Sequence, residues 1–183
     1  NHSMPLAEFA ILHLQLLSKN DYLANLVQWF SYVTCIITAM LLAKDLSASE
    51  RGQWLSGLFV ATLPMAIFQS NSTQNDLVVA ALCLLFMVFL LRFLKEMQTK
   101  NLILCAVALG MALLTKGSSY IYCASIGLVT ALWYLFKCPN LHIRLKMLGL
   151  LLVIVSLALS TNIGHYWRNY SLYGHPLSTE TKG

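Results

Sequence analysis

Long apolar stretches, separated by short polar segments, make up most of this chain. Six of them are long enough to cross, or nearly cross, the roughly 30 Å hydrocarbon core of a bilayer, which takes about 20 helical residues. They cover residues 22–44, 52–69, 76–95, 101–116, 118–137 and 145–164. Apolar residues are continuous within each stretch, whereas they would alternate in a transmembrane β-barrel. The pattern predicts an all-α, polytopic membrane helical bundle with about six transmembrane helices.

One more helix is predicted before the first span, over residues 5–18, with Ser3 as its N-cap and Pro5 in its first turn. Its roughly 14 residues would cover only about 21 Å. Polar residues also interrupt its apolar surface, at Glu8, His13 and Gln15. We therefore expect an interfacial juxtamembrane helix that does not cross the bilayer.

The composition agrees with a membrane protein. Of 183 residues, 58% are hydrophobic and 10% are charged, against about 25% charged in soluble domains. The mean hydropathy of +0.67 implies more apolar surface than one small core could bury. None of the five cysteines forms a C-x-x-C pair, so we expect neither a disulfide framework nor a zinc site.

The domain organisation is expected to be simple, with residues 1–183 forming a single transmembrane domain. The sequence begins at Asn1 without a signal peptide and stops at Gly183 within a polar stretch. We therefore expect an internal fragment of a longer protein.

The distribution of basic residues predicts the orientation of the chain. The net charge is +5, but the lysines and arginines stand singly between apolar stretches, so no nucleic-acid partner is expected. Consecutive spans alternate sides, which divides the polar segments into two sets. One set holds Lys44, Arg51, Arg92, Lys95, Lys100, Lys137, Arg144 and Lys146, and the other holds only Lys19, Lys116, Arg168 and Lys182. The positive-inside rule places the first set in the cytoplasm.

The four tryptophans fit this orientation. Trp54 and Trp133 are predicted near the inner interface, and Trp29 and Trp167 near the outer one. Such aromatic belts are typical of membrane proteins.

Two charged residues on the predicted outer face are candidates for chemistry. Asp76 opens a span, so its carboxylate lies at a helix N-terminus, where the macrodipole stabilises it by about 0.3–1 kcal/mol. It is either a helix cap or an acidic group that orients a hydroxyl or a metal ion in an outer cleft. Lys116 lies between two spans that leave almost no length for a loop. Its side chain either snorkels to the surface or pairs with an anion such as phosphate.

The segment after the last span carries more polar groups, including Arg168, Asn169 and Tyr173, and we expect a turn made rigid by Gly174 and Pro176. This segment is either an interfacial anchor or a binding surface. His165, like His2, is either an ordinary interfacial residue, a metal ligand or a phosphate partner. Transfer from a lipid phosphate needs a cation to stabilise the leaving phosphate and a carboxylate to take a proton, and this face offers both.

The order of these elements resembles the polytopic GT-C glycosyltransferases of the family 39 type, which include protein O-mannosyltransferases and lipid A aminoarabinose transferases. The resemblance covers nearly the whole chain. Its elements are His2-Ser-Met-Pro-Leu6 at an outer juxtamembrane helix, Asp76 at the start of a span, Gly110-Met-Ala-Leu-Leu-Thr-Lys-Gly117, and Trp167-Arg-Asn-Tyr-Ser-Leu-Tyr-Gly-His-Pro-Leu177.

This resemblance implies a transferase that moves a sugar, with inversion, from a polyprenyl-phosphate carrier to an acceptor glycan, lipid or protein on the non-cytoplasmic face. It implies that Lys116, Arg168, His2, Asn169 and Tyr173 contact the carrier phosphate. Asp76 would be a secondary acidic residue, and His165 a ligand for a divalent metal ion or a phosphate partner; no cofactor is certain.

The family's main catalytic carboxylate precedes the His-x-x-Pro-Leu element, which would place it upstream of residue 1, so the fragment alone is expected to be inactive. A bacterial inner membrane, with the functional face in the periplasm, is the expected location. Two alternatives use the same residues without chemistry. They are a transporter or flippase of a lipid-linked anionic substrate, and a non-catalytic membrane assembly subunit.

Overall fold

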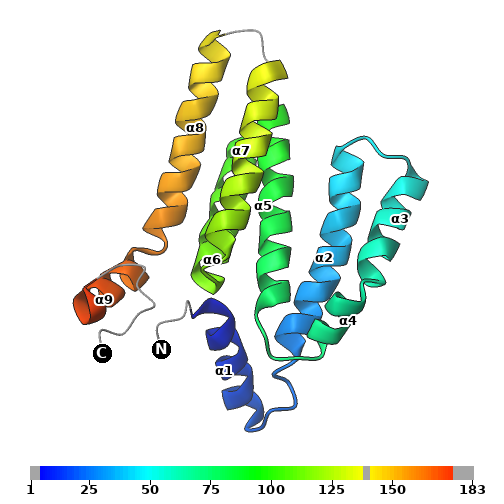
Figure 1. The fold of residues 1–183 in the computed structure, drawn as a ribbon, viewed down its shortest axis with the longest axis vertical. Helices are drawn as coiled ribbons and strands as arrows, with labels where there is room; N and C mark the ends of the chain where they lie inside the picture. Colours follow the sequence, from blue (N-terminus) through cyan, green and yellow to red (C-terminus); the bar gives the residue numbers. More distant parts are fainter. Residues whose placement is uncertain (1–4, 138–140, 175–183) are drawn as a thin grey trace.

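The structure is a computed structural model that describes residues 5–137 and 141–174, and within these ranges the chain is helical and contains no strand. Figure 1 shows the helices in order. They are α1 (Leu6–Ser18), α2 (Leu26–Asp45), α3 (Glu50–Ala61), α4 (Pro64–Ser70), α5 (Asp76–Glu96), α6 (Thr99–Thr115), α7 (Ser119–Lys137), α8 (Leu141–Ser160) and α9 (Ile163–Tyr173).

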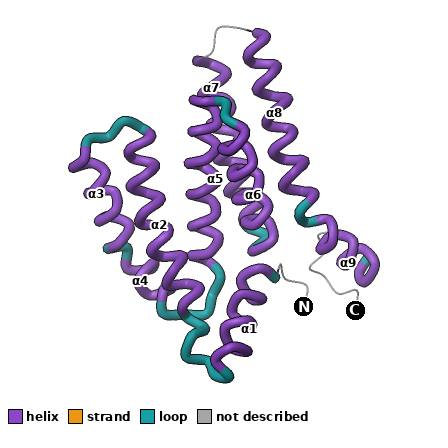
Figure 2. The backbone as a smooth tube through the Cα atoms, turned by 180° about the vertical axis from the view of Figure 1, so that it is seen from behind, coloured by secondary structure: helices purple, strands orange, loops and turns teal. Residues whose placement is uncertain are grey.

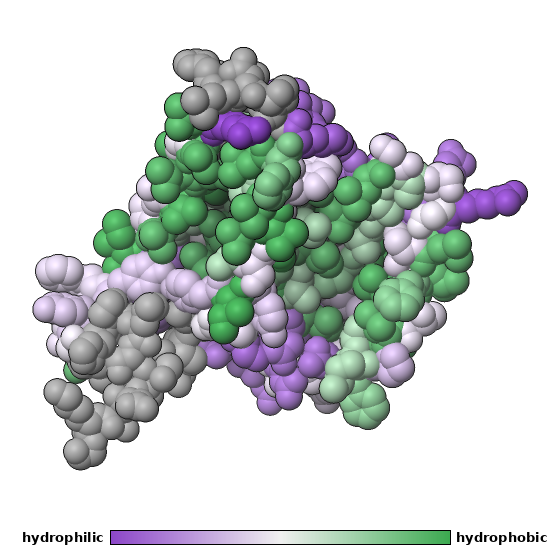
Figure 3. Space-filling view, turned by 45° about the horizontal axis from the view of Figure 1, so that its top comes forward, coloured by the Kyte–Doolittle hydropathy of each residue, from purple (hydrophilic) through white to green (hydrophobic). Residues whose placement is uncertain are grey.

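Helix α5 lies at the centre of the bundle. It packs against α2, α4, α6 and α7, and α6 in turn packs against α1, α7 and α8. The most apolar part of α5 is 61% buried within the protein, whereas those of α2 and α7 are only 22% and 17% buried. The peripheral helices therefore present apolar side chains outward. On the face seen in Figure 3, hydrophobic residues cover much of the middle and hydrophilic ones gather towards the upper and lower edges, as expected for a protein in a bilayer.

The predicted all-α membrane bundle is confirmed. Helices α2, α5 and α7 are each long and apolar enough to cross a membrane, and α8 with α9 adds a fourth span if this bent pair is counted as one. Helix α6 is apolar but has only 17 residues. Fewer helices of the described chain therefore reach full spanning length than the six predicted.

The second predicted span, over residues 52–69, is wrong as a continuous helix. It divides into α3 and α4, because Pro64 has no N–H to continue the helix and its ring disfavours a helical conformation for the residue before it. Leu63 accordingly adopts φ −63° and ψ 113°. Pro64 then takes the first position of α4, where a missing N–H costs nothing.

The end of the last span also differs from the prediction. A bend of 53° separates α8 from α9, and most of α9 occupies residues for which the sequence analysis predicted no helix. The helix ends at Gly174, whose φ of 76° is left-handed and suits glycine. Gly174 is thus placed where the turn was predicted, and Pro176 lies outside the described residues.

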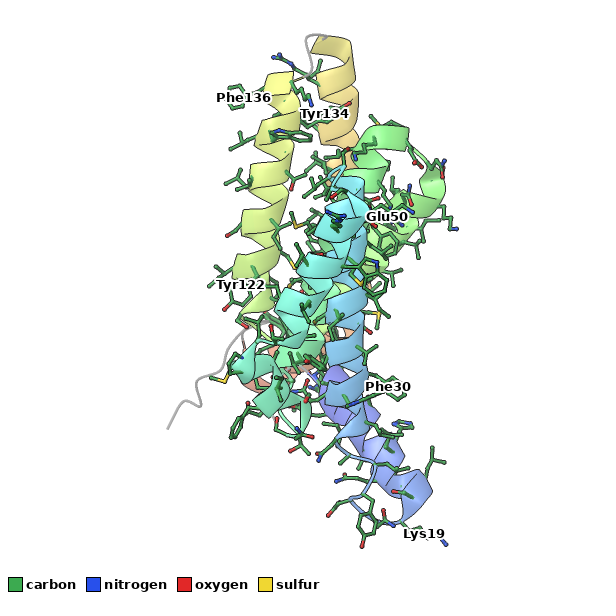
Figure 4. All side chains as sticks on the ribbon, turned by 90° about the vertical axis from the view of Figure 1, so that its right-hand side faces the viewer. Lys19, Phe30, Glu50, Tyr122, Tyr134 and Phe136 are labelled. Carbon is green, nitrogen blue, oxygen red and sulfur yellow. The ribbon has the colours of Figure 1, made fainter. Side chains whose placement is uncertain are left out.

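The polar connections lie at two opposite ends of the bundle. We call the end that holds α1, α9 and the connections 71–75 and 116–118 the α1 end (Figure 1). The opposite end holds the connections 46–49 and 97–98, and seen from behind in Figure 2 the helices run between these two ends. In Figure 4, Lys19 lies at the tip of α1, and Tyr122 and Phe136 point away from the bundle along α7.

The tryptophans follow this division. Trp29, near the start of α2, and Trp167, on α9, belong to the α1 end. Trp54, near the start of α3, and Trp133, near the end of α7, belong to the opposite end. All four are exposed, as aromatic residues of two interfacial belts should be.

Candidate functional site

Asp76 and Lys116 lie in direct contact at the α1 end. Asp76 begins α5, and Lys116 directly follows α6. Because these two helices are antiparallel neighbours, the start of α5 lies beside the end of α6. The Nζ atom of Lys116 donates a hydrogen bond to Asp76 Oδ1. Gln69 Nε2 donates to Asp76 Oδ2 at 3.5 Å. A cation and a carboxylate therefore face the same space, as the sequence suggested.

This ion pair remains accessible to a ligand. The side chains of Lys116 and Asp76 are 40% and 38% exposed, and ion pairs this open to solvent contribute only about 0–1 kcal/mol. Lys116 is therefore paired with an anion of the protein rather than simply extended towards solvent. An incoming phosphate can compete with Asp76 for it, because charge-assisted hydrogen bonds to phosphate are strong.

A cavity of about 330 Å³ adjoins the pair, and helix α1 forms one of its walls. It is lined by Ala7, Glu8, Ile11, Thr73, Gln74, Asn75, Asp76 and Lys116. Glu8 gives this cavity a second carboxylate, which the sequence analysis did not select as a site residue. Nothing in the local pattern distinguishes Glu8, because its position depends on how α1 packs against α6.

The second polar cluster lies on α9 and consists of His165, Arg168 and Asn169. Residues three and four apart share one face of a helix, so the helical conformation of this segment brings the three side chains together. Arg168 Nη2 lies 3.4 Å from His165 Nδ1, and Asn169 Nδ2 lies 3.1 Å from His165 Nε2. Asn169 is buried, whereas Arg168 is exposed and can reach a ligand.

The contacts of His165 favour a neutral imidazole. Arg168 can only donate, so Nδ1 must accept and the ring proton must reside on Nε2. Nε2 then faces the side-chain amide of Asn169. Burial, and next the charge of Arg168, lower the pKa of His165 below its ordinary value. A neutral histidine beside an exposed arginine is suited to bind an anion.

An apolar cavity of about 410 Å³ lies between helices of the bundle. Helices α5, α6, α7 and α8 all contribute to its lining, which includes Phe86, Leu113, Tyr120 and Ile154. At the α1 end, the Tyr120 hydroxyl lies 2.5 Å from the Tyr166 hydroxyl. Tyr120 thus joins the wall of the apolar cavity to the polar helix α9.

Gly110 and Asn162 fix the bend between α8 and α9. Asn162 is buried, and its Nδ2 donates to the Gly110 carbonyl oxygen at 3.1 Å and to the Ala158 carbonyl oxygen at 2.9 Å. A Cβ at position 110 would lie 2.4 Å from Thr161 Oγ1 and 3.3 Å from the Ala158 carbonyl oxygen. Only glycine therefore permits α8 to approach α6 this closely, which positions α9.

The predicted site residues form two clusters. Lys116 contacts Asp76, and Arg168 and Asn169 contact His165. Tyr173 is the last residue of α9, but its side chain lies outside the described part of the structure, as does the whole of His2. Within the described ranges no three His, Cys, Asp or Glu side chains are grouped to hold a metal ion, and the metal role of His165 stays a prediction.

The comparisons with known proteins identify one family. A family model described as "predicted membrane protein (DUF2142)" matches residues 22–174, which include helices α2 to α9. No curated protein and no solved structure matches the chain. Since the family model covers well over half of the sequence, this chain belongs to the DUF2142 family of predicted membrane proteins.

Proposed function

We propose that this chain is the donor-binding part of a membrane glycosyltransferase of the GT-C type, which transfers a sugar from a polyprenyl-phosphate carrier to an acceptor on the non-cytoplasmic face. The observation that carries the proposal is the apolar cavity of about 410 Å³ that ends at Tyr120 beside the polar helix α9. A long apolar chain with an anionic end suits this arrangement, because the lining is apolar and Tyr120 contacts Tyr166 of the polar helix α9.

The charged residues of the α1 end suit the phosphate of this carrier. Arg168 is exposed, and its neighbour His165 adds a hydrogen-bonding group without competing negative charge. Lys116 lies four residues before Tyr120. Its ammonium group forms an ion pair with the solvent-accessible carboxylate of Asp76. We infer that the carrier phosphate takes Lys116 from Asp76 when it binds.

This exchange would give Asp76 a role in the reaction. The acceptor hydroxyl oxygen attacks the anomeric carbon and the bond from that carbon to the phosphate oxygen breaks, so polyprenyl phosphate leaves with the bonding electron pair. The hydroxyl proton must pass to a base. Asp76, released from Lys116, and Glu8 are the carboxylates that line the adjacent cavity. The resemblance gives Asp76 a secondary acidic role, and we propose that it orients the acceptor hydroxyl while the main base lies upstream of residue 1.

The donor site can be tested with a polyprenyl phosphate and the matching polyprenol, which has the same tail without the phosphate. The full-length protein in detergent micelles should bind the phosphate more tightly, as measured by native mass spectrometry. Lys116→Ala and Arg168→Ala should each weaken phosphate binding about tenfold, since a hydrogen bond to a charged group contributes about 1.5–3 kcal/mol. Polyprenol binding should not change.

Lys19→Asn provides the control, because Lys19 is an exposed cation at the same end that lines neither cavity. Asparagine tolerates its left-handed conformation, with φ of 54°. The proposed donor site would be refuted if the protein bound polyprenyl phosphate and polyprenol equally tightly. It would also be refuted if Lys19→Asn and Lys116→Ala weakened the binding of polyprenyl phosphate equally. Phosphate binding without transfer from any polyprenyl-phosphate sugar would replace the transferase with a transporter or flippase of the same lipid.

A further inference from the structure

A second charged cavity, of about 490 Å³, lies at the opposite end of the bundle, where α2 and α5 end and α6 begins. Its lining is Lys44, Asp45, Ser47, Arg92, Lys95, Glu96, Gln98, Lys100 and Asn101. Four of these side chains are cationic and two are acidic, so the cavity carries a net charge of +2. The excess of lysine and arginine at this end assigns it to the cytoplasmic side of the membrane.

One acidic residue of the cavity is already neutralised. Arg92 Nε lies 2.7 Å from Asp45 Oδ2, and Arg92 Nη2 lies 3.4 Å from Asp45 Oδ1. Lys95 Nζ donates to the backbone carbonyl oxygen of Asp45. Because this oxygen is uncharged, the positive charge of Lys95 is not compensated by the contact. The ammonium groups of Lys44 and Lys100 have no hydrogen-bond or ion-pair partner within the described residues. Three lysine charges therefore face the cavity, against the one carboxylate of Glu96.

Asn101 gives independent reason to expect a ligand in this cavity. Its residue surface is only 7% exposed, and it lines the cavity beside Lys100. A side-chain amide offers two N–H donors to a ligand. An oxygen atom of a bound anion would accept a hydrogen bond from this amide. The first turn of α6, which begins at Thr99 without a side-chain cap, would also favour negative charge there.

We propose that this cavity binds a phosphate ester, with Lys44, Lys95, Lys100 and Asn101 as its ligands. At the cytoplasmic surface such a group is carried by anionic lipids and by soluble phosphate esters. Basic cavities between helix ends on this side of a membrane are suited to anionic headgroups. The site is separate from the proposed donor site, because it lies at the other end of α5 and α6 and shares no residue with it.

The test uses the full-length protein in neutral detergent, to which phosphatidylglycerol, phosphatidylcholine or glycerol 3-phosphate is added, with thermal stability and native mass spectrometry as readouts. Phosphatidylglycerol should bind and raise the melting temperature, whereas phosphatidylcholine should not. Binding of glycerol 3-phosphate as well would show that the site accepts soluble esters, and its failure to bind would identify the ligand as a lipid headgroup. Equal affinity for the two lipids would overturn the proposal.

Variants can separate this site from general surface charge. Lys100→Gln should weaken phosphatidylglycerol binding about tenfold, since it removes one charge-assisted hydrogen bond. Arg51→Gln removes the same charge from an exposed position at the same end that does not line the cavity, and it should have little effect. If both variants weaken binding equally, the attraction is diffuse and the site does not exist.

Asn101→Leu gives a result that a purely structural role would not produce. It should reduce the rise in melting temperature that phosphatidylglycerol produces, because the amide that donates to the phosphate is removed, whatever its effect on the lipid-free protein. A fall in the lipid-free melting temperature with an unchanged lipid shift would show that Asn101 is not a ligand. None of these measurements depends on sugar transfer, so their failure would leave the proposed function untouched.

Discussion

The contact between α6 and α8 at Gly110 can be tested by adding a single methyl group. In Gly110→Ala, the new Cβ would lie 2.4 Å from Thr161 Oγ1 and 3.3 Å from the Ala158 carbonyl oxygen. The Thr161 side chain would have to rotate and lose its 2.7 Å hydrogen bond to that carbonyl. Overpacking of this kind costs about 1–3 kcal/mol and the lost hydrogen bond about 1 kcal/mol. The better helix propensity of alanine returns about 1 kcal/mol.

We therefore expect Gly110→Ala to destabilise the protein by about 1–3 kcal/mol, measured by unfolding in detergent micelles. Gly149→Ala is the matched control on α8, because a Cβ at position 149 meets nothing within 4 Å. It should be neutral or stabilise by up to about 1 kcal/mol. Adding Thr161→Ala to Gly110→Ala removes the closest obstacle and should restore part of the loss. Equal stability of Gly110→Ala and Gly149→Ala would refute the close approach of α8 to α6.

Two further predictions concern His165 and a pair of buried cysteines. Burial and Arg168 lower the pKa of His165, so the unfolded chain binds a proton more readily than the folded one, and folding stability should decline as pH falls through the ordinary histidine pKa of about 6.5. The melting temperature should drop between about pH 7.5 and pH 5.5 in the wild type and less in His165→Gln; identical pH profiles would show that His165 is not held in its neutral form. The Sγ atoms of Cys83 on α5 and Cys123 on α7 lie 3.5 Å apart, so mild oxidation should join these two cysteines before any pair that involves Cys35 or Cys105. Peptide mass mapping would detect the link, and a first link elsewhere would contradict the packing of α7 on α5.

The bundle could be predicted because its signal is local. Continuous apolar stretches identified α2, α5 and α7, and the antiparallel order of α5 and α6 brings the start of one helix near the end of the next. The meeting of Asp76 and Lys116 follows from that order. Pro64 indicates that residues 52–69 do not form one continuous helix. The prediction overlooked it because it relied on the hydrophobicity of the whole stretch.

Helix α9 was missed for the opposite reason, since it is too polar to be recognised by hydrophobicity alone. Its signal was periodicity, because Ile163, Tyr166, Trp167 and Tyr170 recur at the spacing of one helix face. Glu8 could not be assigned to the cavity from sequence, since its place depends on the packing of α1 against α6, which no local pattern encodes. The role of Asn162 could not be predicted from sequence either, because its hydrogen bond to Gly110 joins residues 52 positions apart.

Both proposed sites stand on the same pair of helices, which makes their independence testable. Asp76 and Arg92 are 16 residues apart on α5, a distance of about 24 Å along a helix. Because α5 is the most buried spanning helix, we expect it to act as a rigid spacer without two alternative arrangements, and coupling between distant sites requires such alternatives. The effects of Lys116→Ala and Lys100→Gln on polyprenyl phosphate binding, measured with phosphatidylglycerol present, should then add to within about 0.5 kcal/mol in the double variant. A larger interaction energy would show that α5 and α6 move together when either end is occupied, and the bundle would then have to be described as two conformations.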